Sequence, residues 1–367
     1  MMKNVLFIVN SLGGGGAERV CVNLANKMAD SACNVKIITV FDRNDKTPYR
    51  LDKKIEIYNL GYNLNNKFEK LKCLLFAYQK INRYIKGLDL DWDLITSHLP
   101  MSNMITRRSS IGKKAIYVLH STIRTFSENQ SNLFKAGLRR FFKGRKVCCV
   151  SDGIRKECLK KYGFSKKNTF TIYNPLELRK TNANDSSKKL KINNLKPFML
   201  VVGRLNQLKR QDRAIKIFEQ GEFYKKLNLV FCGDGELMYE LTDQAKNTEG
   251  ARRIHFVGWQ NNVSDWIKNA EVLLCTSDTE GFPMNLVEGV NEGVKIVSAD
   301  CAFGPNEILT GEYAKYLVRD KENISEYVDK INLALEKYPS SKNPIIEKCS
   351  PEKIVDQYFR FYKKGEK

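Results

Sequence analysis

Two glutamates flank a Gly-Phe-Pro turn late in the chain. The apolar run VLLCTS (272–277) leads to Glu280, and a helix that should begin near Asn285 carries Glu288. The first N–H groups of a helix bind phosphate, and a carboxylate accepts hydrogen bonds from sugar hydroxyls. We therefore expect Glu280 at the mouth of a binding loop and Glu288 about one turn into the helix. The spacing also fits Glu288 as a surface residue of that helix.

Two cations follow a second apolar run of this kind. Gly203 ends the run, and Arg204 and Lys209 come before the next expected helix. At the carboxyl end of a parallel strand, such a pair could hold a diphosphate. Ordinary solvated cations at a helix start would give the same pattern.

A glycine-rich turn, GGGGAERV (13–20), follows the first apolar run of the chain. Glycines let a backbone approach an anion, and a helix N-terminus favours negative charge there. The spacing is neither that of a dinucleotide-binding loop nor that of a P-loop. A tight strand-to-helix turn is the plain alternative.

The chain has three histidines. His98 and His120 each end an apolar run, and His255 lies inside one. A histidine at a strand end is consistent with a site residue and equally with a hydrogen-bonded structural residue. His255 is expected to be structural.

Apolar runs alternate with helical stretches along the whole chain. The runs are VLFIVN (5–10), VKIITVF (35–41), LITSH (94–98), AIYVLH (115–120) and VCCVS (147–151), then MLVVG (199–203), LNLVFCG (227–233), IHFVG (254–258), EVLLCTS (271–277) and VKIVSAD (294–300). Continuous apolar runs are typical of parallel strands buried on both faces. The helical stretch 68–86 places Phe68, Leu71, Leu75, Tyr78 and Ile85 on one face.

The two series of runs predict two doubly wound α/β domains. A polar stretch, 177–196, separates them and is a linker by composition. We predict an N-terminal domain over 1–176, a C-terminal domain over 197–350, and a C-terminal helix, 351–365, that returns to the first domain. Ligands are expected at the carboxyl ends of the strands, in a cleft between the domains.

Several motifs together resemble the family 4 glycosyltransferases. They are E-G-F-P-x-x-L-x-E-G (280–289), V-G-R-L-x-x-x-K (202–209), F-C-G-D-G-E-L (231–237), G-G-A-E-R-V (15–20) and D-L-I-T-S-H (93–98). The resemblance implies retaining sugar transfer on a GT-B fold, which is two Rossmann-like domains facing across a cleft. G-P-N-E-I-L (304–309) further resembles members that build bacterial lipopolysaccharide, capsule or lipid-linked oligosaccharide.

The resemblance also implies roles for individual residues. Glu280 and His120 would lie beside the transferred sugar, and Glu288 would hold the ribose hydroxyls. Arg204 and Lys209 would stabilise the leaving diphosphate, on which charge develops. The other residues expected to line the donor are Gly203, Val257, Gly258, Trp259, Phe282, Pro283, Met284, Asn285 and Leu286. The loop with Gly14, Gly15 and Gly16 would close on the donor diphosphate or on the acceptor. Glu280 is not expected to be a nucleophile, because in this family the leaving phosphate is thought to deprotonate the acceptor hydroxyl.

The expected substrates are a nucleotide sugar, taken to be UDP-linked, and a lipid-linked saccharide of O-antigen, lipopolysaccharide or capsule. The family implies no cofactor and no metal. DLDWD (89–93) contains a D-x-D pattern, but it precedes a strand and matches the family's pre-strand acid. The alternatives are a nucleotide-sugar epimerase of the same fold and a basic nucleic-acid-binding protein, which would need a module that we do not find.

Positive charge is concentrated in the N-terminal half. Residues 1–180 carry 34 basic and 14 acidic side chains, against 28 and 27 in the remainder. The segment 133–146 interleaves cations with aromatics, and we predict a membrane-contacting helix. Its main contact residues would be Arg139, Arg140, Phe141, Phe142 and Lys143. A core helix with solvated cations is the alternative.

Ten cysteines without a C-x-x-C pair favour buried thiols in a reducing compartment. No apolar run approaches the ~20 residues that span a bilayer. The N-terminal run is expected to be a strand rather than a signal peptide. The expected location is therefore the cytoplasm, at the inner face of an anionic membrane.

Overall fold

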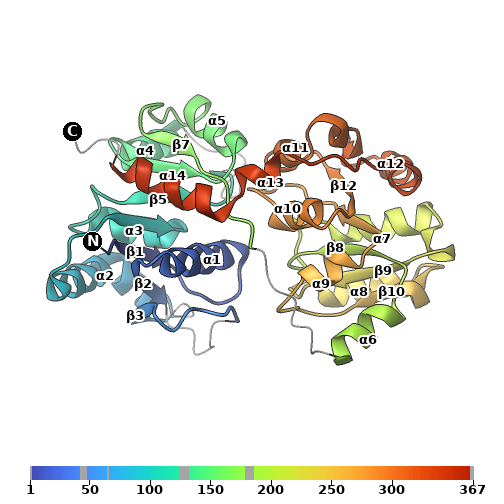
Figure 1. Cartoon of the computed structure of the whole chain (residues 1–367), viewed down its shortest axis with the longest axis horizontal. Coiled ribbons are helices and arrows are strands. Elements are labelled where there is room, and N and C mark those ends of the chain that lie inside the picture. The colour runs from blue at the N-terminus through green and yellow to red at the C-terminus, as the bar shows by residue number, and fades with distance from the viewer. Residues whose placement is uncertain (1, 42–47, 64–65, 124–131, 178–185, 364–367) are drawn as a thin grey trace. The chain divides into compact units, whose positions relative to one another are not determined.

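The computed structural model describes residues 2–41, 48–63, 66–123, 132–177 and 186–363. The chain divides into two compact units (Figure 1): unit 1 comprises 1–177 and 348–367, and unit 2 comprises 178–347. Helix α6 (Ser186–Asn194) lies within the stretch predicted as a linker. Residues 178–185 of that stretch, and 364–365 of the predicted C-terminal helix, lie outside the described residues.

Unit 1 is built on a seven-stranded parallel sheet with the order β3-β2-β1-β4-β5-β6-β7. Its strands are β1 (Asn4–Val9), β2 (Asn34–Phe41), β3 (Glu56–Tyr62), β4 (Leu94–His98), β5 (Ile116–Leu119), β6 (Lys146–Cys149) and β7 (Thr169–Thr171). The chain builds outward from β1 in one direction and then from β4 in the other. The carboxyl ends of β1 and β4 therefore flank the switch point, where such sheets bind ligands.

Helices cover both faces of this sheet. They are α1 (Gly16–Asp30), α2 (Lys67–Leu88), α3 (Pro100–Arg108), α4 (Asn132–Phe142), α5 (Asp152–Lys160) and α14 (Pro351–Lys363). Helix α14 returns to unit 1 and packs beside α1, where Lys27 and Glu352 form an ion pair of 2.5 Å. The Cys148 thiol on β6 donates to the Tyr358 hydroxyl of α14 over 3.7 Å.

Unit 2 repeats the plan with six parallel strands in the order β10-β9-β8-β11-β12-β13. The strands are β8 (Phe198–Val202), β9 (Asn228–Cys232), β10 (Ile254–Phe256), β11 (Val272–Cys275), β12 (Lys295–Ala299) and β13 (Leu317–Val318). The remaining α-helices are α7 (Gln211–Gln220), α8 (Met238–Lys246), α9 (Ser264–Lys268), α10 (Met284–Asn291), α11 (Pro305–Ile308), α12 (Ile324–Glu336) and α13 (Ile345–Lys348). Here the switch point lies between β8 and β11.

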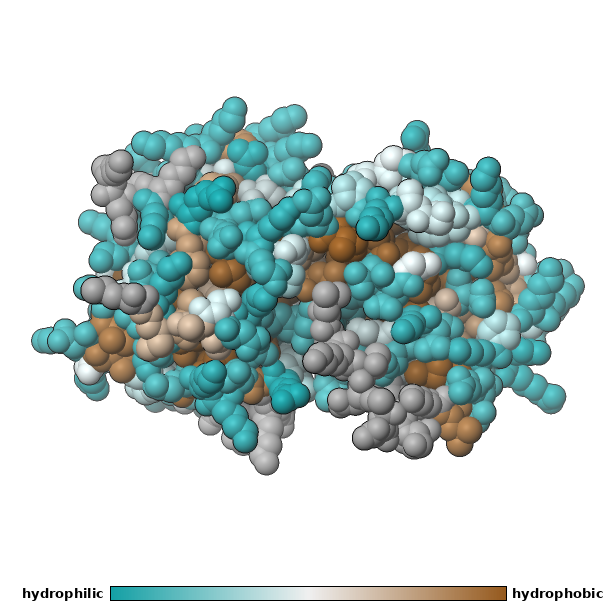
Figure 2. All heavy atoms as spheres, viewed as in Figure 1, coloured by the Kyte–Doolittle hydropathy of each residue, from teal (hydrophilic) through white to brown (hydrophobic). Residues whose placement is uncertain are grey.

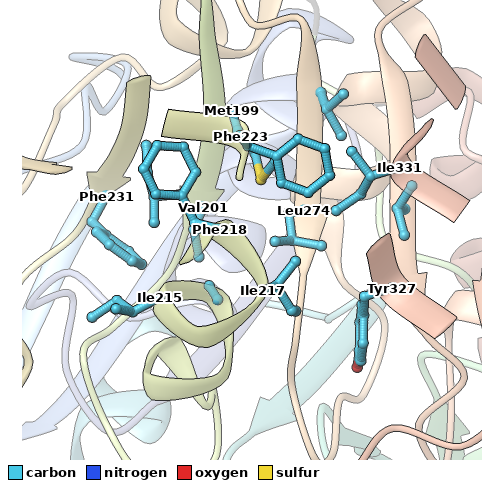
Figure 3. Packing of buried hydrophobic residues seen from close by; sticks show 14 of the residues in the cluster. Met199, Val201, Ile215, Ile217, Phe218, Phe223, Phe231, Leu274, Tyr327 and Ile331 are labelled. Carbon is cyan, nitrogen blue, oxygen red and sulfur yellow. The ribbon is translucent and has the colours of Figure 1, made fainter. Parts of the chain in front are cut away.

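The core of unit 2 fixes the strands that carry its switch point. Figure 3 shows Met199 and Val201 of β8 packed with Phe218 of α7, with Leu274 of β11 and Tyr327 of α12 nearby. All five side chains are at most 5% exposed. Truncating a buried Leu, Met or Phe to Ala typically costs about 2–5 kcal/mol. The loops that leave β8 and β11 therefore start from fixed positions.

Helix α2 presents its predicted apolar face to solvent rather than to the core. Helix α2 forms where expected, but Phe68, Leu71 and Leu75 are 77%, 55% and 43% exposed. The side that packs on unit 1 carries the smaller residues Cys73 and Ala77. Periodicity identified the helix correctly, but it does not say which face the rest of the fold covers.

The burial of the cysteines and the apolar length of the helices agree with the expectations from the sequence. All ten cysteines are free, and nine of them are buried. Among the helices of the described residues, none combines the length and apolar character needed to cross a bilayer.

Candidate functional site

Two loops meet at the switch point of unit 2. The first leaves β8 and carries Gly203, Arg204 and Lys209, and the second leaves β11 and carries Glu280. They are neighbours because β8 and β11 pair in parallel, with Met199 opposite Val272. The structure thus brings together residues that lie about seventy positions apart in the sequence and that the motifs assigned to one site.

Lys209 and Glu280 form an ion pair at the centre of this site. The Lys209 Nζ lies 2.5 Å from Glu280 Oε1, and the Ser277 hydroxyl donates to the same oxygen over 2.7 Å. The side chains are only 28% and 9% exposed. Burial alone would lower the pKa of Lys209, but the charge of Glu280 and its hydrogen bond outweigh burial and raise that pKa. Lys209 therefore carries its positive charge at neutral pH.

The backbone around Lys209 is held by the end of β11. The Thr276 hydroxyl donates to the Lys209 carbonyl over 3.0 Å, and the Asp278 N–H donates to the Leu208 carbonyl over 2.8 Å. The Asn206 side-chain oxygen accepts from the Lys209 N–H over 3.1 Å. These bonds preorganise the lysine before any ligand arrives, which lowers the cost of binding one.

A buried arginine holds the same loop in place. Arg213, 1% exposed, donates to the Thr276 carbonyl over 2.6 Å and pairs with Asp278 at 3.1 Å and Glu322 at 2.5 Å. Burial raises the pKa of Asp278, but hydrogen bonds from Lys321, Arg213 and Arg210 reverse this effect and lower it overall. The network keeps Asp278 ionised and locks the turn that precedes Glu280.

Helix α10 begins directly beyond Glu280. Pro283 is its N-cap residue and has no N–H to donate, whereas Met284 and Asn285 occupy its first turn. The Asn285 side chain donates to the Val202 carbonyl at the end of β8 over 3.3 Å and accepts from the Leu286 N–H over 3.0 Å. The helix start is thereby tied to the strand that carries the cations.

Glu288 points into unit 2 rather than into solvent. It lies in α10 with Leu286 and Gly289 and is 5% exposed. Phe282, also predicted to bind donor, is likewise 5% exposed. The alternative of a surface glutamate on this helix is therefore wrong, and a buried carboxylate suits the binding of ligand hydroxyls.

Close contacts between backbone segments shape one side of the site. A Cβ on Gly233 would lie 1.9 Å from the Gly203 carbonyl oxygen, so the turns that follow β8 and β9 are in direct contact. Gly258, at φ +71°, accepts from the Gly233 N–H over 3.0 Å. Trp259 beyond it is 45% exposed and so presents a ring that a planar base could contact.

Arg204 remains available to a ligand. Its side chain is exposed, and within the described residues it makes no ion pair within 4.0 Å. Its carbonyl accepts from the buried Gln211 amide over 2.9 Å, so the backbone is fixed while the guanidinium is not. An anion at the site would meet Arg204 and Lys209 from one loop.

The glycine loop of unit 1 lies at the carboxyl end of β1. The Gly15 N–H donates to Glu18 Oε2 over 2.5 Å, and the Ser11 hydroxyl donates to the other carboxylate oxygen over 2.6 Å. The Glu18 carboxylate thus occupies the Gly15 N–H. Around Gly16, by contrast, a Cβ would meet no atom within 4 Å, so the space there is open.

His98 and His120 meet at the same edge of unit 1. His98 Nδ1 lies 2.9 Å from His120 Nε2, and His98 Nε2 lies 3.0 Å from the Thr96 hydroxyl. Burial lowers the pKa of His98 well below its ordinary value and lowers that of His120 to about 4. Both imidazoles are therefore neutral at neutral pH, so His120 can offer a hydrogen bond but is a weak base.

The Cys21 thiol lies near this histidine pair and completes a group of potential metal ligands. The two imidazole nitrogens are 2.9 Å apart. Two nitrogens on one zinc ion, each at about 2.0 Å, would lie roughly 3.3 Å apart. The geometry is thus that of a hydrogen bond between the rings. Asp93, the last acid of the D-x-D pattern, accepts from the Asn4 N–H at the amino edge of the sheet, away from these groups.

The residues predicted to contact a membrane lie in and after α4. Arg139, Arg140 and Lys143 are exposed as expected. Phe142, however, is 9% exposed and packs edge-on against Tyr117 at 5.9 Å. Phe141 is half-buried, and its carbonyl accepts from Arg107 over 2.9 Å. The two phenylalanines thus anchor the helix to unit 1, and its exposed apolar side chains are Leu133 and Phe134.

Both units match a described family of enzymes. Residues 182–348 match Glycosyl transferases group 1, and residues 14–180 match Glycosyltransferase Family 4. The two matches meet at the boundary between the units and together cover most of the chain. The chain belongs to the family 4 glycosyltransferases. This identification favours the transferase over the epimerase and nucleic-acid-binding alternatives.

Several named relatives of this glycosyltransferase are bacterial. One is an N-acetylgalactosaminyltransferase of Campylobacter jejuni whose name gives a diphospho-undecaprenol-linked saccharide as its acceptor; it is 26% identical over 88% of each chain. The amylovoran biosynthesis glycosyltransferase AmsD of Erwinia amylovora is 25% identical over 84% of each chain. A TarM mutant of S. aureus, solved with UDP among its ligands, aligns with a TM-score of 0.76 at 15% identity over 99% of this chain and 100% of that one. The enzyme thus has the GT-B fold.

Three supporting groups were not identified from the sequence of the glycosyltransferase. Ser277 lies three residues before Glu280, and that spacing after a strand was a usable signal. Arg213 had no signal of its own, because Arg210 and Lys216 are cations close to it in the sequence. Thr96 has no such signal, because its contact with His98 depends on the side-chain conformation at the end of β4.

Proposed function

We propose that this glycosyltransferase transfers a sugar from a UDP-linked donor to a lipid-linked saccharide, with retention of the anomeric configuration. The product would belong to a bacterial surface polysaccharide, such as O-antigen, lipopolysaccharide or capsule. The observation that carries the proposal is the half-buried Lys209–Glu280 pair at the switch point of unit 2, next to the start of α10. The UDP in the TarM structure and the acceptor named for the Campylobacter jejuni relative support the choice of substrates.

In this proposal the donor diphosphate binds Lys209, Arg204 and the first N–H groups of α10. Glu288 accepts from the ribose hydroxyls, and Glu280 accepts from a hydroxyl of the sugar. No metal ion is required, because two cations and a helix N-terminus supply the positive potential. Phe282, Pro283 and Leu286 shape the site mainly through the backbone.

The chemical step exchanges one bond to the anomeric carbon for another. The bond between that carbon and the diphosphate oxygen breaks, and a bond to the acceptor oxygen forms on the same face. The acceptor proton moves to the departing phosphate oxygen. Lys209 and Arg204 stabilise the charge that develops on the diphosphate. His120, which is neutral, serves as a hydrogen-bonding partner in unit 1 rather than as a general base.

The enzyme is also proposed to work in the cytoplasm at the inner face of an anionic membrane, where a lipid-linked acceptor resides. The exposed cations Arg139, Arg140 and Lys143 support this placement. Each cation near an anionic leaflet contributes about 1 kcal/mol.

A donor screen tests the proposal. Nucleotide release is followed for UDP-, GDP- and other activated sugars, with a bacterial lipid extract as the source of acceptor. We expect release from a UDP-sugar, and we expect Glu280→Ala to abolish it with the fold intact. The matched control is Glu292→Ala, which removes an exposed glutamate from the far end of α10. Normal turnover in Glu280→Ala, or an isomerised donor without release, would overturn the assignment.

A further inference from the structure

The first half of α2 presents large apolar side chains to solvent. Phe68, Leu71, Leu75 and Phe76 are 77%, 55%, 43% and 51% exposed, and we call these four residues the α2 ridge. Figure 2 shows apolar atoms on the surface at the end of unit 1 where Figure 1 draws α2. A contiguous exposed patch of large apolar residues on a soluble domain usually marks an interaction site.

The α2 ridge is fixed in this outward orientation. The Asn66 side chain caps the helix by accepting from the Phe68 N–H over 2.9 Å. Arg108 of α3 donates to the Leu74 carbonyl over 2.6 Å and lies 4.7 Å from the centre of the Tyr78 ring. The opposite side of the helix is buried against unit 1 through Cys73, Ala77 and Ile81. Rotation that hid the ridge would expose this buried side instead.

Cations surround the α2 ridge. Lys67, Lys70 and Lys72 are exposed among its apolar residues. The single acid of this part of the helix, Glu69, pairs with Lys72 at 3.1 Å. Toward the C-terminal end, the outward positions become polar, as at Gln79 and Arg83. Apolar side chains set among lysines complement a surface with anionic headgroups above an apolar interior.

The α2 ridge lies on the same side of unit 1 as the basic helix α4. Helix α3 connects the two: Arg108 contacts α2, and Arg107 donates to the Phe141 carbonyl of α4 over 2.9 Å. Helix α4 exposes Leu133, at 82%, together with Arg139 and Arg140. One flat partner could therefore contact both helices.

We infer that the α2 ridge is a membrane-docking element that inserts into the headgroup region of an anionic bilayer. Its four apolar side chains enter the boundary of the acyl chains, and Lys67, Lys70 and Lys72 contact lipid phosphates. The inference extends the membrane placement proposed above, because it assigns the apolar contact to α2 rather than to Phe141 and Phe142 of α4.

Vesicle co-sedimentation of the full chain tests the α2 ridge. Vesicles of phosphatidylglycerol with phosphatidylethanolamine are compared with vesicles of phosphatidylcholine alone. Phe68→Ser with Leu71→Ser should lower the partition coefficient for anionic vesicles on the order of tenfold or more. The matched control is Tyr239→Ser, which removes an 81%-exposed ring from unit 2 and should leave binding unchanged. Added salt should weaken wild-type binding.

Three results would overturn the inference. They are unchanged vesicle binding in the double variant, equal binding of wild type to neutral vesicles, and a change of the double variant from dimer to monomer in sedimentation with vesicle binding intact. The last result would assign the α2 ridge to contact between two copies of the chain. UDP titration distinguishes failure of this inference from failure of the proposed function, because the double variant should bind UDP like the wild type whatever its vesicle binding.

Discussion

At the scale of single residues, the Lys209–Glu280 pair is the feature from which the proposed chemistry follows. Two half-buried groups of opposite charge stabilise each other, and removing one would leave the other without its partner. A donor can replace both contacts at once, since its diphosphate suits Lys209 and its sugar hydroxyls suit Glu280. After transfer, only the diphosphate remains, and Glu280 then competes with it for Lys209. The pair would therefore favour product release.

The histidine pair of unit 1 should make the free energy of unfolding fall at acidic pH. The pKa of His120 is about 4, against 6.5 in an unfolded chain, so the unfolded state binds more protons between these values. The free energy of unfolding should be constant above pH 6.5 and fall below it, by about 2 kcal/mol at pH 5 from His120 alone. Urea unfolding of wild type and His120→Asn at several pH values measures this. A pH dependence that is the same in both proteins would refute the assignment.

At the scale of elements, the turn before α11 packs against the Gly-Phe-Pro turn before α10. Gly304, at φ +95°, directly precedes α11, and a Cβ there would lie 2.5 Å from Pro283 Cδ. Gly304→Ala should therefore displace the Gly-Phe-Pro turn, destabilise the protein by about 1–3 kcal/mol and weaken UDP binding.

Gly311→Ala is the matched control for this change. Its φ of +60° is also positive, but a Cβ there meets no atom within 4 Å. It should show the backbone strain without the loss of UDP affinity. Calorimetric UDP titration together with urea unfolding compares the two variants. If both lose UDP affinity equally, Gly304 does not act through the turn.

Most strands that are buried on both faces were predictable, whereas an exposed edge strand and the outward face of a helix were not. LITSH (94–98) coincides with β4 because parallel strands must be apolar throughout. Strand β3 was missed because it is an edge strand whose residues are largely exposed. The outward face of α2 was not predictable from periodicity, since Phe68 and Leu71 would form the same pattern in a buried helix. Likewise, motifs located Lys209 and Glu280, but their contact required two loops to be placed side by side.

At the scale of the whole molecule, charge and chemistry are separated between the units. Nearly all of the net charge of +21 lies in residues 1–180, and the remainder of the chain is close to neutral. The diphosphate site of unit 2 needs only a few placed groups, because a cation that is partly shielded from solvent acts strongly over a short distance. The excess charge of unit 1 suits a large anionic surface, in keeping with the α2 ridge.

The most direct test of the account is calorimetric titration of UDP into the full chain in the presence of EDTA. We expect one saturable site in the wild type, at least tenfold weaker binding in Lys209→Ala, and binding about five- to tenfold tighter in Glu280→Gln, which removes the competing charge. Ser277→Ala, which keeps that charge, should bind UDP like the wild type. Binding that requires a metal ion, or that is unchanged in both Lys209→Ala and Glu280→Gln, would contradict the assignment of the diphosphate to this pair.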